Sequence, residues 1–515
     1  MKSSMKPVIY SALFVALLLA CSSSSGVSAD AHVPRADFGA SDGSADTAQG
    51  DLGQVDLGVP DLALDTAAVD ISPSKDQGTT SDVSTLPAGK NLWSKRFGGS
   101  ESEVGHGIGA DAQGNVYVTG YFHDGIDLGG GILKAGGPDD IFVASYTANG
   151  TYRWSKVFGQ NGHDHGLAIA VDAKGNSYIT GYFQYSIDFG GGVLTDAGLS
   201  DIFTVSFDSD GKHRWSKRFG SINNELPYNV AVDAQSNVYF TGIFQREVDF
   251  GGGLLKSAGG FDAYLVSFSS AGVYRWSKRF GSTETDYAHG VGADAQGNVY
   301  VQGAFKGTVN FGGGDLSSNG PDADLFIASY TINGVHRWSK RYGGVEAEQA
   351  RGAAVDGKGN MYITGQLWGD ANLGGALLKN AGSSDIYLAS YDSKGDHRWS
   401  KRFGGAKQDT AAELAVDHSG NVFLVGSFYE SIEMGHGLLT SAGSVDMLIA
   451  SYDSEGGPRW SKSFGDTSSD RAHGVALSPL GQLLVIGEFQ MSVDFGGGVL
   501  TSAGYADAVV LSFTP

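Results

Sequence analysis

The 515-residue chain has a single cysteine, Cys21, which excludes any disulfide bond or cysteine-ligated metal within the rest of the chain. Beyond its first twenty residues it has no apolar run approaching the roughly 20 residues that a membrane-spanning helix needs. No stretch shows the 3.6-residue periodicity of an amphipathic helix, and each of the 79 glycines would cost a helix about 1 kcal/mol. The sequence therefore predicts an all-β fold.

Positive charge is also scarce. After residue 90 the chain carries 30 basic and 45 acidic residues, a net charge of −15. Phosphate binding requires the opposite balance, so we expect no nucleic-acid partner. The chain lacks a phosphate-binding loop, a nucleophile elbow and a zinc motif. We therefore predict no catalytic residues, no cofactor and no metal site, and expect a binding protein rather than an enzyme.

The amino terminus carries a short apolar run. Lys2 and Lys6 precede residues 8–20, which end in Leu18-Leu19-Ala20-Cys21. About 13 apolar residues are too few to span a bilayer and fit a secretory signal. The Leu-x-Ala-Cys ending resembles the lipobox of bacterial lipoproteins, and a plain signal peptide with a chance cysteine is the alternative. The resemblance implies lipidation at Cys21, a membrane anchor through that lipid, and an outer-membrane lipoprotein of the cell envelope, facing the periplasm or the surface.

Residues 22–90 differ in composition from the rest. They hold eleven Asp against Arg35, Lys75 and Lys90, and almost no aromatic residues. Low hydrophobicity and like charge predict a disordered tether, with a reach of roughly 45 Å. The predicted domains are thus a signal peptide (1–20), an acylated Cys21 with its tether (21–90), and a folded domain (91–515).

The folded domain consists of repeats. Seven tryptophans recur every 61 or 62 residues, whereas Trp368 lies outside the series: Trp93, Trp154, Trp215, Trp276, Trp338, Trp399 and Trp460. The unit beginning at Trp154 predicts strands at 167–171, 177–183, 202–207 and 213–219, joined by turns such as Asp-x-x-Gly-Asn. Four short strands per repeat are typical of propeller blades. Seven copies predict an all-β, seven-bladed β-propeller of four-stranded antiparallel blades.

The order of strands predicts how the ring closes. The first copy of the outer strand, at 92–97, precedes any blade, and the chain ends just after the last third strand. We therefore expect the N-terminal strand to complete the seventh blade beside residues 508–513. A linear β-solenoid is the structural alternative.

The repeat resembles the SBBP type of β-propeller repeat, which is related to the NHL repeat. The matching residues are Ala-Val-Asp-x-x-Gly-Asn-x-Tyr-x-Thr-Gly at 170–181 and Asp-x-Phe-x-x-Ser-Tyr at 140–146. The outer strand departs from the family pattern. The resemblance implies a propeller and an extracytoplasmic location, but no activity. The outer strand also resembles quinoprotein repeats, but those repeats are shorter and their dehydrogenases carry a vicinal disulfide, so no quinone is expected.

Two sets of repeated carboxylates have architectural interpretations. Asp127, Asp188, Asp249 and Asp494 precede triple glycines, where they cap turns or ligate Ca²⁺. An Asp also opens each third strand, and seven equivalent carboxylates favour hydrogen-bond caps over catalysis. Lys-Arg pairs on the outer strands favour protection against edge pairing, or contact with an anionic polysaccharide.

The blades differ at the position thirteen residues after each Trp. These residues are predicted to crowd the mouth of the central channel: His106, Leu167, Tyr228, His289, Arg351, Ala412 and His473. His106, Tyr228, His289, Arg351 and His473 form the predicted binding face. Nine acidic residues of the preceding loops are predicted to converge there and to suit a cationic or polyhydroxylated partner: Glu101, Glu103, Asp164, Glu225, Glu284, Glu346, Glu348, Asp409 and Asp470.

Together these features predict a membrane-tethered, monomeric binding or scaffolding propeller, whose partner is a protein or a polysaccharide. Two alternatives stay open. A glycan-acting propeller enzyme would need acidic or aromatic residues from unlike blades in one pocket. An assembly factor for outer-membrane proteins would expose a large apolar patch.

Overall fold

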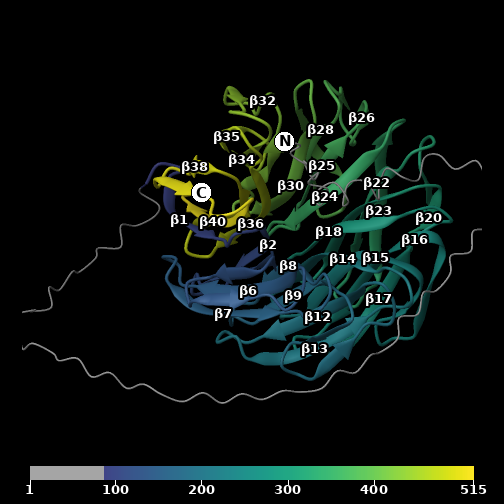
Figure 1. The fold of residues 1–515 in the computed structure, drawn as a ribbon. Coiled ribbons are helices and arrows are strands. Elements are labelled where there is room, and N and C mark those ends of the chain that lie inside the picture. The colour runs from purple at the N-terminus through teal and green to yellow at the C-terminus, as the bar shows by residue number, and fades with distance from the viewer. Residues whose placement is uncertain (1–85) are drawn as a thin grey trace, which may run out of the picture. The chain divides into compact units, whose positions relative to one another are not determined.

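The computed structural model describes residues 86–515, which form the predicted seven-bladed β-propeller of four-stranded antiparallel blades (Figure 1). Cys21, the predicted signal peptide and the predicted tether up to residue 85 lie outside the described residues. No helix in residues 86–515 has the length and apolar character needed to cross a membrane. We number the blades 1 to 7 in chain order.

Each blade places its four strands in succession from the channel outward. The innermost strands are β2 (Glu103–Ala110), β8 (His165–Val171), β14 (Leu226–Val232), β18 (Tyr287–Ala293), β24 (Glu348–Val355), β30 (Asp409–Val416) and β36 (Arg471–Ser478). The second strands are β3 (Val116–Phe122), β9 (Ser177–Phe183), β15 (Val238–Asp249), β19 (Val299–Phe305), β25 (Met361–Leu367), β31 (Val422–Phe428) and β37 (Gln482–Phe489). Neighbouring innermost strands are in contact all the way round, and β2 touches both β8 and β36, so the ring is closed.

The outer half of each blade contains the repeat tryptophans. The third strands are β6 (Asp140–Tyr146), β12 (Asp201–Phe207), β16 (Leu254–Phe268), β22 (Asp324–Tyr330), β28 (Asp385–Tyr391), β34 (Asp446–Tyr452) and β40 (Asp507–Phe513). The outermost strands are β7 (Tyr152–Phe158), β13 (His213–Phe219), β17 (Tyr274–Phe280), β23 (His336–Gly344), β29 (His397–Phe403), β35 (Pro458–Phe464) and, in blade 7, β1 (Asn91–Phe97). The strand ranges predicted for blade 2 are confirmed to within two residues.

A small hairpin between the second and third strands was not predicted from the sequence. Five blades have it as a separate two-stranded sheet: β4 (Gly125–Asp127) with β5 (Ile132–Lys134), β10 (Ser186–Asp188) with β11 (Val193–Thr195), β20 (Thr308–Asn310) with β21 (Asp315–Ser317), β32 (Ser431–Glu433) with β33 (Leu438–Thr440), and β38 (Ser492–Asp494) with β39 (Val499–Thr501). In blade 5 the hairpin of β26 (Ala371–Asn372) and β27 (Leu377–Leu378) also pairs with β23 of blade 4. In blade 3 the hairpin continues β15 and β16. Asp127 Oδ1 accepts from the backbone N–H groups of Gly129 at 2.8 Å and Gly131 at 3.1 Å. Asp188, Asp249 and Asp494 do the same, as turn caps do.

The Asp-x-x-Gly-Asn-x-Tyr run forms a buried polar network. In blade 1 Asp111 accepts hydrogen bonds from Gln113 N, Asn115 N and the Tyr117 hydroxyl. Tyr117 in turn accepts from Arg153 of the outermost strand, which also donates to Ser145 Oγ at 2.8 Å. The repeat therefore keeps these residues because together they join all four strands of a blade.

The tryptophans link successive blades. The indole Nε1 of Trp154 donates to Ser209 O of the next blade at 2.9 Å, and five other series members make the equivalent bond: Trp93, Trp215, Trp276, Trp338 and Trp399. The turn that contains Gly211 packs against the indole of Trp154. A Cβ at Gly211 would lie 2.8 Å from that indole, and the φ of Gly211 is +75°, so both space and backbone conformation favour glycine. Within the described chain the Trp460 Nε1 is buried without a partner, because the corresponding turn is split between the two ends of the domain.

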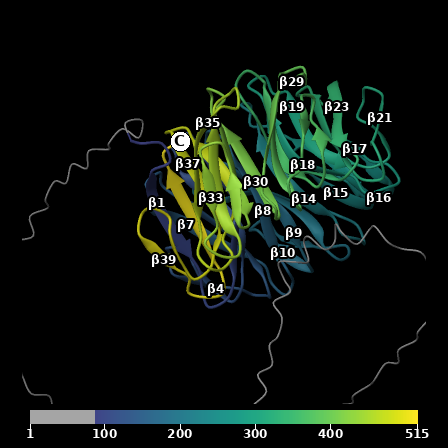
Figure 2. The same cartoon turned by 90° about the horizontal axis from the view of Figure 1, so that it is seen from above.

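The predicted closure is confirmed. β1 pairs antiparallel with β40, from Asn91 opposite Phe513 to Phe97 opposite Ala508 (Figure 1). Figure 2 shows β1 from above, beside the yellow C-terminal part of the chain. Thr514 N donates to Lys90 O at 2.9 Å, which extends the pairing beyond the strands. Blade 7 therefore contains both the first and the last strand of the domain.

The interpretation of the Lys-Arg pairs needs correction. In five blades the arginine of the pair is drawn to the Asp that opens the third strand: Arg96 to Asp507, Arg218 to Asp201, Arg279 to Asp262, Arg341 to Asp324 and Arg402 to Asp385. These carboxylates are almost fully buried, and a buried charge needs a partner. The arginines therefore balance the charge of these buried aspartates. Of each Lys-Arg pair, only the lysine is left to protect the outer strand or to contact an anionic polysaccharide.

Candidate binding site in the channel

The residues that differ between blades all occupy a β-bulge, which the sequence did not predict. In every innermost strand the pairing register slips at the position thirteen residues after the Trp: His106, Leu167, Tyr228, His289, Arg351, Ala412 and His473. All seven are half-buried. A bulge leaves its residue out of the ladder and re-aims its side chain. Each blade thus has, at the same position of its innermost strand, a side chain that the strand pairing of the blade does not require.

Blades 3 to 5 combine an arginine with aromatic rings. The ring of Tyr228 stacks on His289, with centroids 4.7 Å apart and an angle of 9°. Burial, and next the charge of Arg351, lower the pKa of His289 to about 3, so its imidazole is neutral at physiological pH. Arg351 Nε and His289 Nδ1 are buried and have no hydrogen-bond partner among the described residues. Unpaired buried polar atoms are costly, which marks this cluster as a place for a ligand or water.

A hydrogen bond crosses the channel below this cluster. Asn229 of blade 3 donates to Glu413 of blade 6, with Nδ2 and Oε2 2.9 Å apart. Each residue directly follows the bulge position of its blade. Burial raises the pKa of Glu413 to about 7, although Leu414 N, Asn229 and Arg351 oppose the shift. The channel is therefore narrow at this level, and its mouth is the accessible part.

A second cluster joins blades 7 and 1. The rings of His106 and His473 lie 5.1 Å apart, and the Glu488 carboxylate lies 3.4 Å from Arg471 Nη1 and 3.7 Å from His473 Nε2. Burial would raise the pKa of Glu488, but His473, Arg471 and His106 lower it to about 2. The five residues of the predicted face are thus divided: His106 and His473 lie together, and Tyr228, His289 and Arg351 form the other group.

The predicted acidic surface is wrong for six of its nine residues. Glu103, Asp164, Glu225, Glu348, Asp409 and Asp470 are buried, whereas Glu101, Glu284 and Glu346 are exposed. Each buried carboxylate accepts backbone N–H groups of its own loop, as Glu348 does from Gly344 N at 2.8 Å. Burial raises the pKa of Glu103 and Glu348 to about 8. Asp286 is the seventh member of this set, and the constant spacing of ten residues after each Trp was the signal for a structural role.

Comparisons with known proteins agree on the repeat and the fold. Residues 92–121 match the family model SBBP, described as a beta-propeller repeat. An uncharacterized WD repeat-containing protein, L264 of Acanthamoeba polyphaga mimivirus, is 19% identical over 78% of this chain and 36% of its own length. The regulatory protein FlaEY of Caulobacter vibrioides is 26% identical over 69% of this chain and 40% of its own. The chain therefore spans well under half of either relative.

Solved structures include a gluconolactonase of Xanthomonas campestris, 13% identical over 65% of this chain and 84% of its own, with a TM-score of 0.30. The repeat match and the seven blades together show an SBBP-type β-propeller.

Proposed function

We propose that this SBBP-type propeller is a non-catalytic binding or scaffolding module, tethered to the bacterial cell envelope through a lipid on Cys21. The observation that carries the proposal is the bulge position. Seven blades of one design present five different residue types there, and Arg351 Nε and His289 Nδ1 are buried without a hydrogen-bond partner in residues 86–515. Repeat proteins place binding residues at positions that the repeat itself leaves free.

The chemistry of the larger cluster indicates the kind of partner. Arg351 offers fixed donors beside the stacked rings of Tyr228 and His289, an arrangement suited to carboxylate or hydroxyl groups of a protein or polysaccharide. A cationic partner is not favoured, because most of the loop carboxylates point into the fold and accept backbone N–H groups.

Changing the cluster should weaken binding without harming the fold. The variant Tyr228→Ala/Arg351→Gln should capture its partner from native envelope membranes at least tenfold less well, about 1.4 kcal/mol. Its melting temperature should be nearly unchanged, because Arg351 Nε has no hydrogen-bond partner among the described residues and both residues lie outside the strand pairing. Quantitative mass spectrometry of captured material, with full-length protein as bait, measures the change.

The control is an outer-wall variant, Lys278→Gln/Lys401→Gln, which should capture normally. If the outer-wall variant loses capture and the channel variant keeps it, the partner binds elsewhere. Replacement of whole loops is a poorer test, because loop residues such as Asp286 and Asp470 are buried caps.

The enzyme alternative has one observation in its favour. Glu413 and Glu488 both lie near the channel, and their pKa values move in opposite directions, to about 7 and about 2. Such divergence is usual for an acid and its partner carboxylate. Glu413, however, is engaged by Asn229 across the channel, so we favour binding over hydrolysis.

The assembly-factor alternative depends on a contiguous apolar surface. Three of the most exposed aliphatic side chains each follow the glycine-rich turn of a small hairpin in a different blade: Ile132 (72% exposed), Leu438 (65%) and Val499 (65%). Single apolar residues on separate hairpins are ordinary surface features. We therefore place this alternative after binding at the channel mouth.

The tether has its own test. Cys21→Ser should abolish incorporation of a fatty-acid analogue and leave the protein as unprocessed precursor, or soluble if another peptidase cuts it. The reason is that the thiol is the group that the lipid joins. Metabolic labelling and fractionation of membranes measure both outcomes, and label that persists in the serine variant contradicts lipidation at Cys21.

A further inference from the structure

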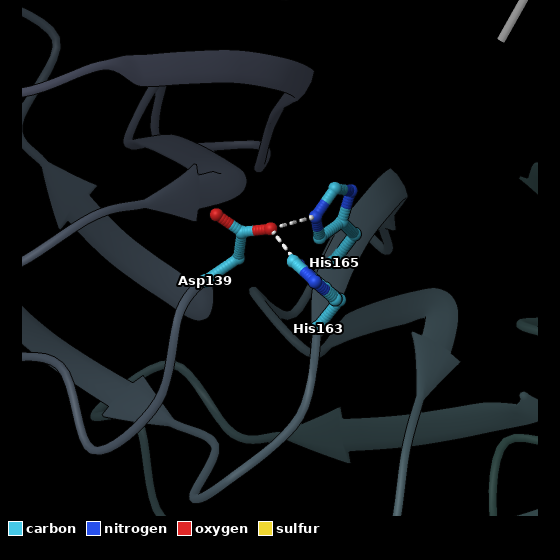
Figure 3. A group of neighbouring side chains, drawn as sticks. All are labelled: Asp139, His163 and His165. Carbon is cyan, nitrogen blue, oxygen red and sulfur yellow. Dashed lines mark hydrogen bonds and ion pairs between the residues drawn. The ribbon is translucent and has the colours of Figure 1, made fainter. Parts of the chain in front are cut away.

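Four side chains with metal-binding chemistry meet where blade 1 faces blade 2. Asp139 precedes β6, His163 precedes β8 and His165 begins β8, and Figure 3 shows the two imidazoles directed at one oxygen of the carboxylate. His123, directly after β3, approaches the other oxygen. None of these residues belongs to the predicted binding face. No metal site was predicted from the sequence, because these residues are up to 42 positions apart in it.

The contacts centre on Asp139, whose side chain is 7% exposed. Its Oδ2 contacts Nδ1 of His163 and lies 3.1 Å from Nε2 of His165. Nε2 of His123 lies 2.5 Å from Oδ1, yet Oδ1 is buried and accepts no hydrogen bond of acceptable geometry from the described residues. The donor atoms of Asp139, His163 and His165 all lie within 4.8 Å of one another. They could therefore surround a single small ion.

The far sides of two rings are held as in metal sites. His123 Nδ1 lies 3.0 Å from Ser102 O, and His165 Nδ1 lies 2.9 Å from the Tyr182 hydroxyl. The His165 ring also stacks on Tyr121 at 3.7 Å and 10°. A metal-bound histidine usually donates its second N–H to such an oxygen, which fixes both the tautomer and the ring plane. Both Nε2 atoms are thereby left free to turn a lone pair toward Asp139.

The tautomers indicate a cation between these atoms. A carbonyl oxygen only accepts, so neutral His123 carries its hydrogen on Nδ1, and its Nε2 lone pair then faces Asp139 Oδ1. Two acceptors at 2.5 Å repel each other unless a cation lies between them. A proton on His123 is the alternative source of that charge, because the imidazolium would donate to both Ser102 O and Asp139 Oδ1. One divalent ion satisfies neutral imidazoles and the ionised carboxylate together.

The other blade boundaries show that the fold does not need these residues. At the boundary of blades 1 and 2, an isolated parallel β-bridge joins Asp139 to His163. The equivalent bridges at other boundaries join Ser200 to Asn224, Ser384 to Gln408, Val445 to Ser469 and Ala506 to Ser102. The position that His123 has in blade 1 is also variable: it holds Gln184, Gln245, Lys306, Trp368, Tyr429 and Gln490 in the other blades. Histidine and aspartate therefore come together at a boundary that folds with serine, glutamine or valine elsewhere.

The donor set selects the metal. Two imidazole nitrogens and one carboxylate oxygen suit Zn²⁺, which takes such ligands at Zn–N distances near 2.0–2.1 Å and can hold water or a substrate as its fourth ligand. Ca²⁺ and Mg²⁺ prefer sites made entirely of oxygen. The side chains of His163 and His123 are 42% and 37% exposed, so an ion can enter from solvent.

We propose that Asp139, His163 and His165 bind one divalent transition-metal ion of the zinc class between blades 1 and 2, with His123 beside the other oxygen of the Asp139 carboxylate. The ion joins the start of the third strand of blade 1 to the loop that leads into blade 2. This role is independent of the proposed partner site in the channel.

Zinc binding to the full chain tests the proposal. Tag-free protein, stripped with a chelator, should bind one Zn²⁺ per chain in a competition titration with a chromogenic chelator, and its melting temperature should rise with added Zn²⁺. Co²⁺ in the same site should give the visible bands of a tetrahedral ion. His163→Ala/His165→Ala should weaken Zn²⁺ binding at least about a hundredfold, and Tyr182→Phe, which removes one outer-shell oxygen, about tenfold.

His336→Gln/His397→Gln is the matched control, because it removes two imidazoles that bond to serine hydroxyls on outermost strands. It should bind Zn²⁺ as the unaltered protein does. Failure of the unaltered protein to bind Zn²⁺, or equal binding by both double variants, would overturn the proposal. A melting temperature that responds to pH but not to Zn²⁺ would also overturn it, and would assign the cluster to histidine–aspartate ion pairs.

Discussion

A chain that begins at Gly98 is expected to melt at least about 10 °C below a chain that begins at residue 86. Removing β1 leaves β40 as an unpaired edge and takes away Phe97, which is 4% exposed and packs with Ala508 and Val510. It also removes Arg96 from Asp507, whose side chain is fully buried. An uncompensated buried charge alone costs about 3–5 kcal/mol.

The clasp strand also ties blade 7 to blade 1. Trp93 pairs within blade 7 through Ser512, while its indole donates to Ala148 O of blade 1 at 2.9 Å. The loss should therefore open the ring at one boundary, and the exposed edge should promote aggregation. Calorimetry and light scattering on both chains measure these effects.

A peptide of residues 86–97 added in trans should restore part of the stability, since strand addition to an open edge uses the same backbone bonds. Equal melting temperatures for the two chains would mean that the ring does not depend on β1. If the chain that begins at Gly98 melts lower but the peptide does not raise its melting temperature, the cause is a loss of solubility rather than a loss of strand pairing.

The architecture was predictable because the same sequence repeat occurs seven times. The spacing of Trp93 to Trp460, the Asp-x-x-Gly-Asn turns and the misplaced outer strand together predicted the blade, the count and the closure. Each of these signals is local in sequence or periodic. The small hairpins escaped because strands such as β4 and β10 have three residues each, too few to show an alternating pattern.

The candidate sites were less predictable because they depend on contacts between unlike blades. The position of Arg351 was identified, but its bulge depends on how β24 pairs with β25, which no spacing reveals. Asn229 and Glu413 lie 184 positions apart and meet across the channel. The error over Glu103 and Glu348 is different, because counting from each Trp would have shown a repeated cap. Residues that recur in every blade are those that the fold requires. Residues that occur in one blade only, such as Asp139 and His163, are not required by the fold.

Gly365→Ala should destabilise the propeller by about 3 kcal/mol or more, because this glycine makes room for the bulge that presents Arg351. A Cβ at Gly365 would lie 1.9 Å from the backbone oxygen of Gln349, on the adjacent strand β24. The equivalent glycines of the other six blades would place a Cβ 1.9–2.2 Å from the same carbonyl of their own innermost strand: Gly120, Gly181, Gly242, Gly303, Gly426 and Gly487. Relief requires the innermost strand to move, which shifts Arg351 as well.

Gly357→Ala is the matched control in the same blade. Nothing lies within 4 Å of a Cβ at Gly357, and four other blades carry alanine there: Ala112, Ala173, Ala234 and Ala295. This variant should melt at or slightly above the temperature of the unaltered protein, because alanine reduces the freedom of the unfolded chain. The Gly365→Ala variant should have a melting temperature at least about 5 °C lower. It should also capture less partner, because Arg351 is displaced. If both alanine variants melt alike, the glycine is not a steric requirement of the bulge, and the constant position of the channel residues needs another cause.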